Sequence, residues 1–108
     1  FSDGYFSFGY GDAVPELTVK YPNGGEKVYK SGVNIKWEWK NKDWQSPVDI
    51  ELWKNGQFYS KIVNNATSQL YSWISINAPK GDDYKIKIIA SDNKDIFDFS
   101  DNNFQIIE

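Results

Sequence analysis

The sequence predicts an all-β protein, an antiparallel β-sandwich of seven or eight strands with an additional N-terminal aromatic strand. Three observations lead to this fold class. Apolar and polar residues alternate in several short stretches, which is the pattern of strands with one buried and one solvated face. Turn signals rich in Gly, Pro, Asn and Asp separate these stretches at roughly even spacing. No stretch has the period of an amphipathic helix.

The composition describes a single globular domain that lacks the residues of most catalytic sites. The chain has 108 residues, of which 40% are hydrophobic and 18% aromatic. It contains no Cys and no His, and all 12 of its cationic residues are Lys. A thiol nucleophile, an imidazole base, a Ser-His triad and the usual zinc sites are therefore excluded. We expect no enzyme activity and no cofactor.

Charge and hydropathy argue against two further classes of partner. The net charge is -3 with both signs interspersed, so there is no electrostatic basis for binding nucleic acid. No apolar run reaches the ~18 residues of a membrane span. The chain begins at Phe1 rather than Met. This fits an extracellular or cell-surface protein whose signal peptide has been removed, or a module excised from a larger protein.

The first residues differ from the rest of the chain. We expect residues 1–14 to form an N-terminal extension and residues 15–108 to form the sandwich. Phe6, Phe8 and Tyr10 alternate with Ser or Gly, which predicts a strand with one aromatic face and one nearly bare face. Pro15 then ends the run. The aromatic residues of this N-terminal strand are Phe1, Tyr5, Phe6, Phe8 and Tyr10.

From Glu16 onward the pattern predicts a succession of short strands. Val33–Lys40 is the clearest, because its odd positions are apolar and its even positions are polar. Turn signals at Pro22–Gly25 and Lys54–Gly56 separate strands, and the second predicts a hairpin. In chain order the expected strands are Leu17–Tyr21, Lys27–Tyr29, Val33–Lys40, Val48–Trp53, Phe58–Val63, Leu70–Ile76, Tyr84–Ile89 and Phe97–Ile107, with loops at Asn41–Pro47 and Asn64–Ser68.

Several short motifs follow one another along the chain. They include Tyr21-Pro22-Asn23-Gly24-Gly25-Glu26, Asn34-Ile35-Lys36-Trp37, Tyr71-Ser72-Trp73 and Gly81-Asp82-Asp83-Tyr84. Together they resemble the Kre9/Knh1-type domain, the Ser/Thr-rich cell-surface family, over about residues 19–107. The resemblance implies an Ig-like sandwich in a secreted or surface-attached protein. It implies no catalytic residue, and residues 1–12 lie outside it.

The N-terminal aromatic strand suggests a function of its own. An exposed row of Phe6, Phe8 and Tyr10 would promote aggregation, so we expect it to be covered. It either folds back as an edge strand of its own sandwich or adds to the sheet of a neighbouring subunit. We favour the second, in which donor-strand exchange links identical chains into a filament or surface assembly. The alternative is a cell-wall or carbohydrate-binding accessory module of a larger surface protein.

Four other aromatic residues, Trp44, Trp53, Tyr59 and Tyr71, are candidates for an outward surface. Trp53 falls on the polar side of its strand, and Trp44 lies in a predicted loop. Flat aromatic side chains beside carboxylates and amides can stack on the sugar rings of a wall glycan. Packing under a loop or at a protein interface is the simpler interpretation.

Two further features have functional interpretations. Asp92, Asp95, Asp98 and Asp101 form an oxygen-rich stretch that could serve Ca²⁺. They lack a calcium-loop spacing, and turn chemistry explains them more simply, so no metal is expected. Asn65-Ala66-Thr67 is an N-glycosylation triplet in a predicted loop, which makes Asn65 a candidate for modification.

Overall fold

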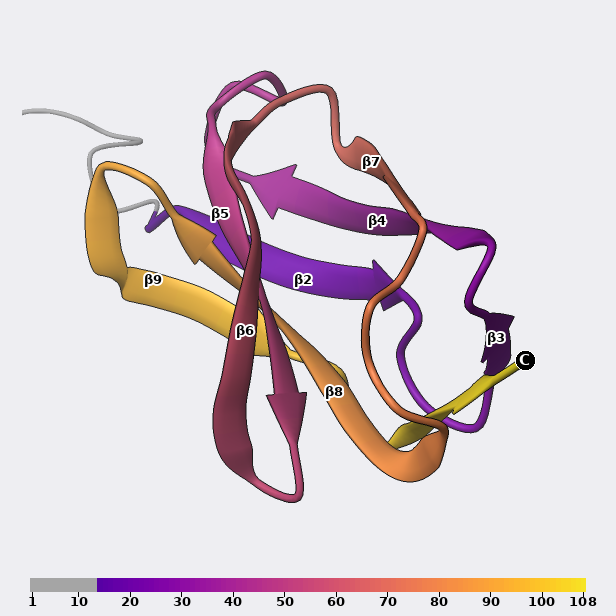
Figure 1. The fold of residues 1–108 in the computed structure, drawn as a ribbon. Coiled ribbons are helices and arrows are strands. Elements are labelled where there is room, and N and C mark those ends of the chain that lie inside the picture. The colour runs from indigo at the N-terminus through magenta and orange to yellow at the C-terminus, as the bar shows by residue number, and fades with distance from the viewer. Residues whose placement is uncertain (1–13) are drawn as a thin grey trace, which may run out of the picture.

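The computed structural model describes residues 14–108. All regular structure in this part of the chain is β-strand, arranged in two facing layers (Figure 1). The described residues therefore contain no helix that is long and apolar enough to cross a membrane. The strands are β2 (Glu16–Tyr21), β3 (Lys27–Tyr29), β4 (Gly32–Lys40), β5 (Val48–Lys54), β6 (Gln57–Ala66), β7 (Leu70–Ile74), β8 (Gly81–Ala90), β9 (Asn93–Phe99) and β10 (Phe104–Ile107).

The two layers are joined by the short strand β3. One layer consists of β2, β4 and β7, with β4 in the middle. The other has the order β6-β5-β8, and the far edge of β8 pairs with β9 along one part and with β10 along another. β3 pairs with β4 at one position and runs parallel to β10. The predicted fold class, an all-β Ig-like sandwich, is confirmed.

Alternation decides which side of each strand faces the core. In β4, Ile35 and Trp37 are 0% and 1% exposed, and Lys36 between them lies in solvent, as the sequence predicts. In the opposite layer, Ile50 of β5 and Ile88 of β8 are buried in the same way. Burying an apolar side chain of this size contributes ~1.5–3 kcal/mol. The inward-facing residues therefore hold the two layers together.

The prediction of one continuous strand over Phe97–Ile107 is wrong. The structure has β9 up to Phe99 and β10 from Phe104, with an interruption between them. Ser100 is 1% exposed at this interruption. Its hydroxyl accepts a hydrogen bond from the Ile86 amide (3.0 Å) and donates one to the Pro22 carbonyl (2.7 Å). The Ser100 hydroxyl thus provides hydrogen-bond partners for two buried backbone groups. The interruption raises the number of strands in the described residues to 9.

The Pro22–Gly25 turn holds this interruption in place. The side-chain oxygen of Asn23 accepts a hydrogen bond from the Asp101 amide (2.8 Å), and its carbonyl accepts one from the Asn102 amide (3.0 Å). The carboxylate of Glu26 accepts hydrogen bonds from two amides of the turn, at 2.6 and 2.8 Å. The Pro-Asn-Gly-Gly-Glu motif therefore acts as a structural clamp that ties the beginning of the sandwich to its last strands.

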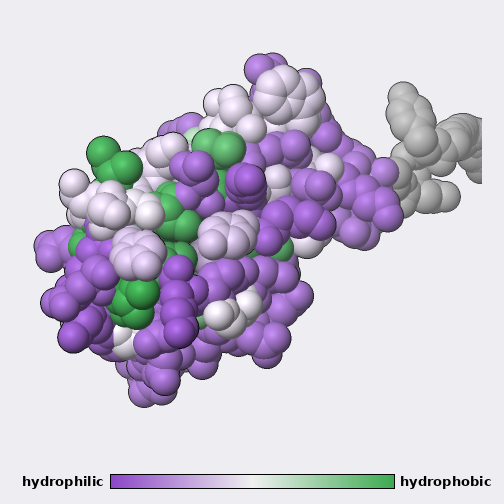
Figure 2. Space-filling view, turned by 90° about the vertical axis from the view of Figure 1, so that its right-hand side faces the viewer, coloured by the Kyte–Doolittle hydropathy of each residue, from purple (hydrophilic) through white to green (hydrophobic). Residues whose placement is uncertain are grey.

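One side of the sandwich is mostly hydrophilic. Figure 2 shows the side that carries β3 and the C-terminus, where apolar residues lie in small separate groups among hydrophilic ones. The large exposed apolar side chains of β3 and β7 are Tyr29 (57%), Leu70 (42%) and Ile74 (68%). Tyr29 is the one aromatic residue among these three side chains.

Candidate functional site

Four aromatic side chains form a row across the outer face of β5, β6 and β9. We call Trp53, Phe58, Phe97 and Phe99 the aromatic row. The ring centroids of Trp53 and Phe99 lie 5.0 Å apart, those of Trp53 and Phe58 6.4 Å, and those of Phe97 and Phe99 6.0 Å. All three pairs pack edge to face, a favourable geometry for aromatic rings. Phe58 and Phe97 remain 53% and 48% exposed, so the row is open to solvent.

Strand register brings the row together from distant parts of the sequence. Trp53 of β5 lies opposite Phe58 of β6 on one side and opposite Lys85 of β8 on the other. Lys87 of β8 lies opposite Phe99 of β9. The positions between these residues on β5 and β8 point into the core. Period-two alternation therefore places all of these side chains on the outer face.

Lys87 lies among the rings of the row. Its Nζ atom is 4.6 Å from the ring centroid of Phe97 and 5.3 Å from the centroids of Trp53 and Phe99. An ammonium group within about 6 Å of a ring centroid is attracted to the ring face. Lys87 therefore places a positive charge among the rings of the row.

A pocket of about 250 Å³ opens beside the row. Its lining residues are Trp53, Gly56, Asp83, Lys85 and Phe99. Two aromatic rings thus share a small cavity with one carboxylate and one ammonium group. Ligand pockets commonly combine apolar walls with a few placed polar groups that fix orientation. This pocket suits a ligand that has an apolar face and a polar rim.

Both carboxylates at this site are paired with lysines. The Oδ1 atom of Asp83 lies 2.7 Å from Nζ of Lys54, and Oε2 of Glu51 lies 3.5 Å from Nζ of Lys61. Glu51 also accepts a hydrogen bond from the indole nitrogen of Trp53 (3.0 Å), which sets the orientation of that ring. The hydrogen bond with Asp83 raises the pKa of Lys54, so this lysine is charged at neutral pH.

The core residue Tyr84 contacts Lys54, the ion-pair partner of the pocket residue Asp83. The ring of Tyr84 is fully buried, and Nζ of Lys54 lies 4.4 Å from its centroid. The tyrosine hydroxyl donates a hydrogen bond to the Pro79 carbonyl (2.5 Å). Burial raises the pKa of Tyr84, and the nearby Lys54 charge opposes this effect only in part. The hydroxyl therefore remains a neutral donor at physiological pH.

Of the four aromatic residues singled out in the sequence, Trp53 is the one that belongs to the row. Trp44 lies in the loop between β4 and β5 and is 53% exposed. Tyr59 is 42% exposed, and its ring packs edge to face with Tyr84 at 6.4 Å. Tyr71 lies on β7 in the other layer and packs against the core. The structure does not bring the four together, and glycan contact by any of them stays a prediction.

The remaining members of the site were not predicted from the sequence. Phe97 and Phe99 occupy alternate positions of one strand, and Lys85 and Lys87 do the same in another. This alternation is visible in the sequence. It places the two phenylalanines on one face of their strand and the two lysines on one face of theirs. It does not reveal that the two strands are neighbours. Phe58 was missed because hairpin pairing, and not local pattern, places it opposite Trp53.

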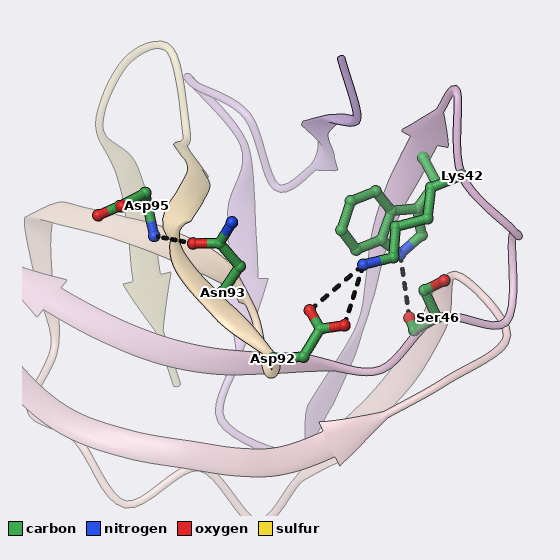
Figure 3. Close-up of polar contacts among 6 residues, drawn as sticks. Lys42, Ser46, Asp92, Asn93 and Asp95 are labelled. Atoms are coloured by element: carbon green, nitrogen blue, oxygen red, sulfur yellow. Dashed lines mark hydrogen bonds and ion pairs between the residues drawn. The ribbon is translucent and has the colours of Figure 1, made fainter. Parts of the chain in front are cut away.

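The first two aspartates considered for Ca²⁺ have separate roles near the start of β9. Figure 3 shows the Asp92 carboxylate beside Lys42, with its oxygens at 3.1 and 3.2 Å from Nζ. The amide of Asp95 donates a hydrogen bond to the side chain of Asn93 (3.0 Å), which shapes the turn. These contacts are an ion pair and turn chemistry.

The other two aspartates bind protein groups elsewhere. Asp98 accepts a hydrogen bond from the Val19 amide (2.8 Å), and Asp101 accepts one from the Asn23 side chain (3.0 Å). Over residues 14–108, no three or more His, Cys, Asp or Glu side chains are grouped so that they could hold a metal ion. The four aspartates therefore contribute to folding contacts in the described structure.

Asn65 lies near the end of β6 and not in the predicted loop, because this strand continues to Ala66. Its φ is +59°, and its amide donates a hydrogen bond to Asp49 (3.1 Å). The residue sits where the pairing of β5 and β6 becomes irregular. Its side chain is exposed. Modification of Asn65 stays a prediction.

The predicted donor strand lies outside the described residues. In the described sandwich, Ile35, Ile50 and Ile106 from three different strands are all 0% exposed. The buried cluster that contains them is made by strands of the sandwich itself. Strand donation by residues 1–12 stays a prediction, and its proposed contact residues are Phe1, Tyr5, Phe6, Phe8 and Tyr10.

Comparison with known proteins agrees with the motifs found in the sequence. The model of the Kre9/KNH-like N-terminal Ig-like domain matches residues 21–106. No curated protein matches the chain. A solved structure of CbhA fibronectin(III)-like modules from Clostridium thermocellum is similar at 15% identity and a TM-score of 0.42, covering 84% of this chain and 92% of that one. Because the family model spans most of the sequence, the chain belongs to the Kre9/KNH-like N-terminal Ig-like domain family.

Proposed function

We propose that this chain is a non-enzymatic accessory module of an extracellular or cell-surface protein, and that it attaches to a wall glycan through the aromatic row and its pocket. Family membership supports the surface location. The observation that carries the binding role is the pocket in which Trp53 and Phe99 share a cavity with Asp83 and Lys85.

The geometry of the pocket fits the two-sided chemistry of a sugar ring. One face of a pyranose ring presents C–H groups, which can pack against an indole or phenyl ring. Its hydroxyls can exchange hydrogen bonds with the carboxylate of Asp83 and the ammonium of Lys85. The open Phe58 and Phe97 would extend the contact along a chain of several sugar units.

Two observations support the non-enzymatic part of the proposal. The chain has no His and no Cys. The two carboxylates at the site, Asp83 and Glu51, are each paired with a lysine. A glycosidase needs one carboxyl group that is protonated and a second that faces it across the scissile bond. Paired carboxylates of this kind fit ligand orientation better than acid catalysis.

The proposal is tested by titrating wall polysaccharides against the purified chain and measuring binding by calorimetry. Trp53→Ala should weaken binding about tenfold or more, since loss of an aromatic anchor removes most of the contact. Trp44→Ala is the matched control and should bind normally, because Trp44 lies away from the row. Thermal unfolding verifies that both variants are folded. Binding that is unchanged in folded Trp53→Ala would rule out this site.

Self-assembly through residues 1–12 is a second candidate function. The observation that favours it is the uncovered edge of β6, a strand of 10 residues that pairs with β5 and has no other strand partner in the described chain. An extended segment can add to such an edge through backbone hydrogen bonds. A segment donated to this edge would extend the layer of β6, β5 and β8 by one strand.

Deletion of residues 1–12 tests self-assembly. The full chain should form polymers by size-exclusion chromatography and electron microscopy, and the deletion variant should be a folded monomer. A full chain that stays monomeric at high concentration, or a deletion variant that still polymerises, would exclude this role for the segment. Replacing Phe6, Phe8 and Tyr10 by Ser in the full-length chain keeps the segment length and isolates the aromatic contribution.

A further inference from the structure

We propose that the glycan recognised at the aromatic row carries carboxylate groups, as in a polysaccharide built from uronic acids. This inference rests on the proposed function, because it specifies the class of ligand that the same site binds. The carboxylates of the sugar would contact Lys85 and Lys87, and the sugar rings would pack on the row.

Two lysines of the site have no ion-pair partner in the described structure. Asp83 is paired with Lys54 at 2.7 Å, and Glu51 is paired with Lys61 at 3.5 Å. Neither Lys85 nor Lys87 has an ion-pair partner among residues 14–108. Glu51 lies opposite Lys87 in the pairing of β5 and β8, but its carboxylate contacts Lys61 and the indole of Trp53, so the ammonium groups of Lys85 and Lys87 remain open to an anionic ligand.

Both lysines lie close to the rings of the row. Lys87 lies within 4.6–5.3 Å of three ring centroids, and Lys85 lines the pocket beside Trp53 and Phe99. A sugar ring stacked on the row would bring its exocyclic substituent close to one of these ammonium groups. A carboxylate in that place gains a charge-assisted hydrogen bond, which is stronger than a bond to a neutral hydroxyl.

The site lacks the groups that recognise phosphate and nucleic acid. The chain has no Arg, and hence no guanidinium that could bind a phosphate with two parallel hydrogen bonds. Nucleic acid would also need a continuous basic surface. The two lysines without an ion-pair partner among residues 14–108 are instead interleaved with aromatic rings. That pattern matches a ligand with regularly spaced carboxylates and apolar ring faces.

The experiment compares acidic oligosaccharides with their neutral counterparts of the same length and linkage. Oligomers of galacturonic acid and of alginate are measured against the same oligomers after reduction of every carboxyl group to a primary alcohol. The intact chain should bind at least one acidic oligomer about tenfold more tightly than its reduced form. Lys85→Gln with Lys87→Gln should abolish this preference and leave the weak binding of the neutral form.

In the matched control variant, two lysines of the opposite layer are replaced, so that the same amount of positive charge is lost away from the row. Lys36→Gln with Lys40→Gln changes two exposed lysines of β4 and should leave the preference intact. Equal binding of acidic and reduced oligomers would overturn the inference while the proposed glycan-binding function stands. Failure of every acidic and neutral polysaccharide to bind would overturn both. Acidic binding that survives Trp53→Ala and disappears with moderate salt would show attraction by charge alone and would also overturn the inference.

Discussion

Trp53 and Phe99 pack edge to face with their ring centroids 5.0 Å apart and their planes at 90°, although the two residues come from strands separated by β8 in the sheet. The contact bridges the outer face above β8. It has a structural role as well as a place in the candidate site, so its contribution to stability can be measured without knowledge of the ligand.

Phe99→Ala should destabilise the fold by about 2 kcal/mol, because it removes a half-buried ring and its contacts with Trp53 and Phe97. Phe58→Ala is the control. Phe58 is 53% exposed and lies farther from Trp53, at 6.4 Å, so its loss should cost less than about 1 kcal/mol. Urea unfolding of both variants gives the comparison, and equal losses would show that the row is not organised around the Trp53–Phe99 contact.

Gly24→Ala should destabilise the clamp between the Pro22–Gly25 turn and the last strands. Gly24 has a φ of +147°, and a Cβ atom there would lie 2.7 Å from the Cβ of Asn102. We expect a loss of about 2–3 kcal/mol in thermal or urea unfolding.

Gly25→Ala separates backbone strain from this close approach. Gly25 has a φ of +80°, but no atom lies within 4 Å of the position of an added Cβ. Its substitution should therefore cost only the strain of a positive φ, about 1 kcal/mol. Similar losses for the two variants would mean that Gly24 does not need to pack closely against Asn102.

Ser100→Ala should cost about 2–3 kcal/mol, since it leaves the Ile86 amide and the Pro22 carbonyl without their partner in a buried position. Ser72→Ala removes an exposed side-chain hydrogen bond to Asn34 (2.9 Å) and should change stability by less than about 0.5 kcal/mol. Chemical denaturation measures both. A neutral Ser100→Ala would show that the strand interruption does not depend on this hydroxyl.

The pH dependence of stability should appear above about pH 10, near the ordinary pKa values of lysine and tyrosine. The pKa values of Lys54 and Tyr84 are both raised in the folded state, the first chiefly by its hydrogen bond with Asp83 and the second by burial. The folded protein therefore holds these protons more tightly than the unfolded chain does. Their contribution is complete below the unfolded pKa values and is lost as pH rises through the folded ones.

Tyr84→Phe tests the tyrosine part of this dependence. The variant removes one titrating group, so its free energy of unfolding should fall less steeply between pH 10 and 11 than that of the natural chain. It should also be less stable at neutral pH, because the hydrogen bond to the Pro79 carbonyl is lost. Urea unfolding over a pH series provides both values. Parallel curves for the two proteins would show that Tyr84 does not contribute to the alkaline loss.

Local pattern predicted the strands well because alternation is a property of neighbouring residues. The positions of β4 follow directly from Val33–Lys40, and β3 coincides with Lys27–Tyr29. The pattern failed at Phe97–Ile107, where a buried hydroxyl and a distant turn interrupt a sequence that is otherwise suited to one strand. Trp53 was recognised as an outward aromatic residue, but its companions Phe97 and Phe99 were not.

The sequence by itself determined that the chain is all-β, which face of the clearly alternating strands is buried, and which family it belongs to. These properties depend on residue periodicity and on short motifs, both of which are local. Only the tertiary structure decided that β9, β8, β5 and β6 are neighbours, and thereby that Lys87 lies among the rings of Trp53, Phe97 and Phe99. Strand order results from long-range pairing and core packing, which alternation within a single strand does not specify.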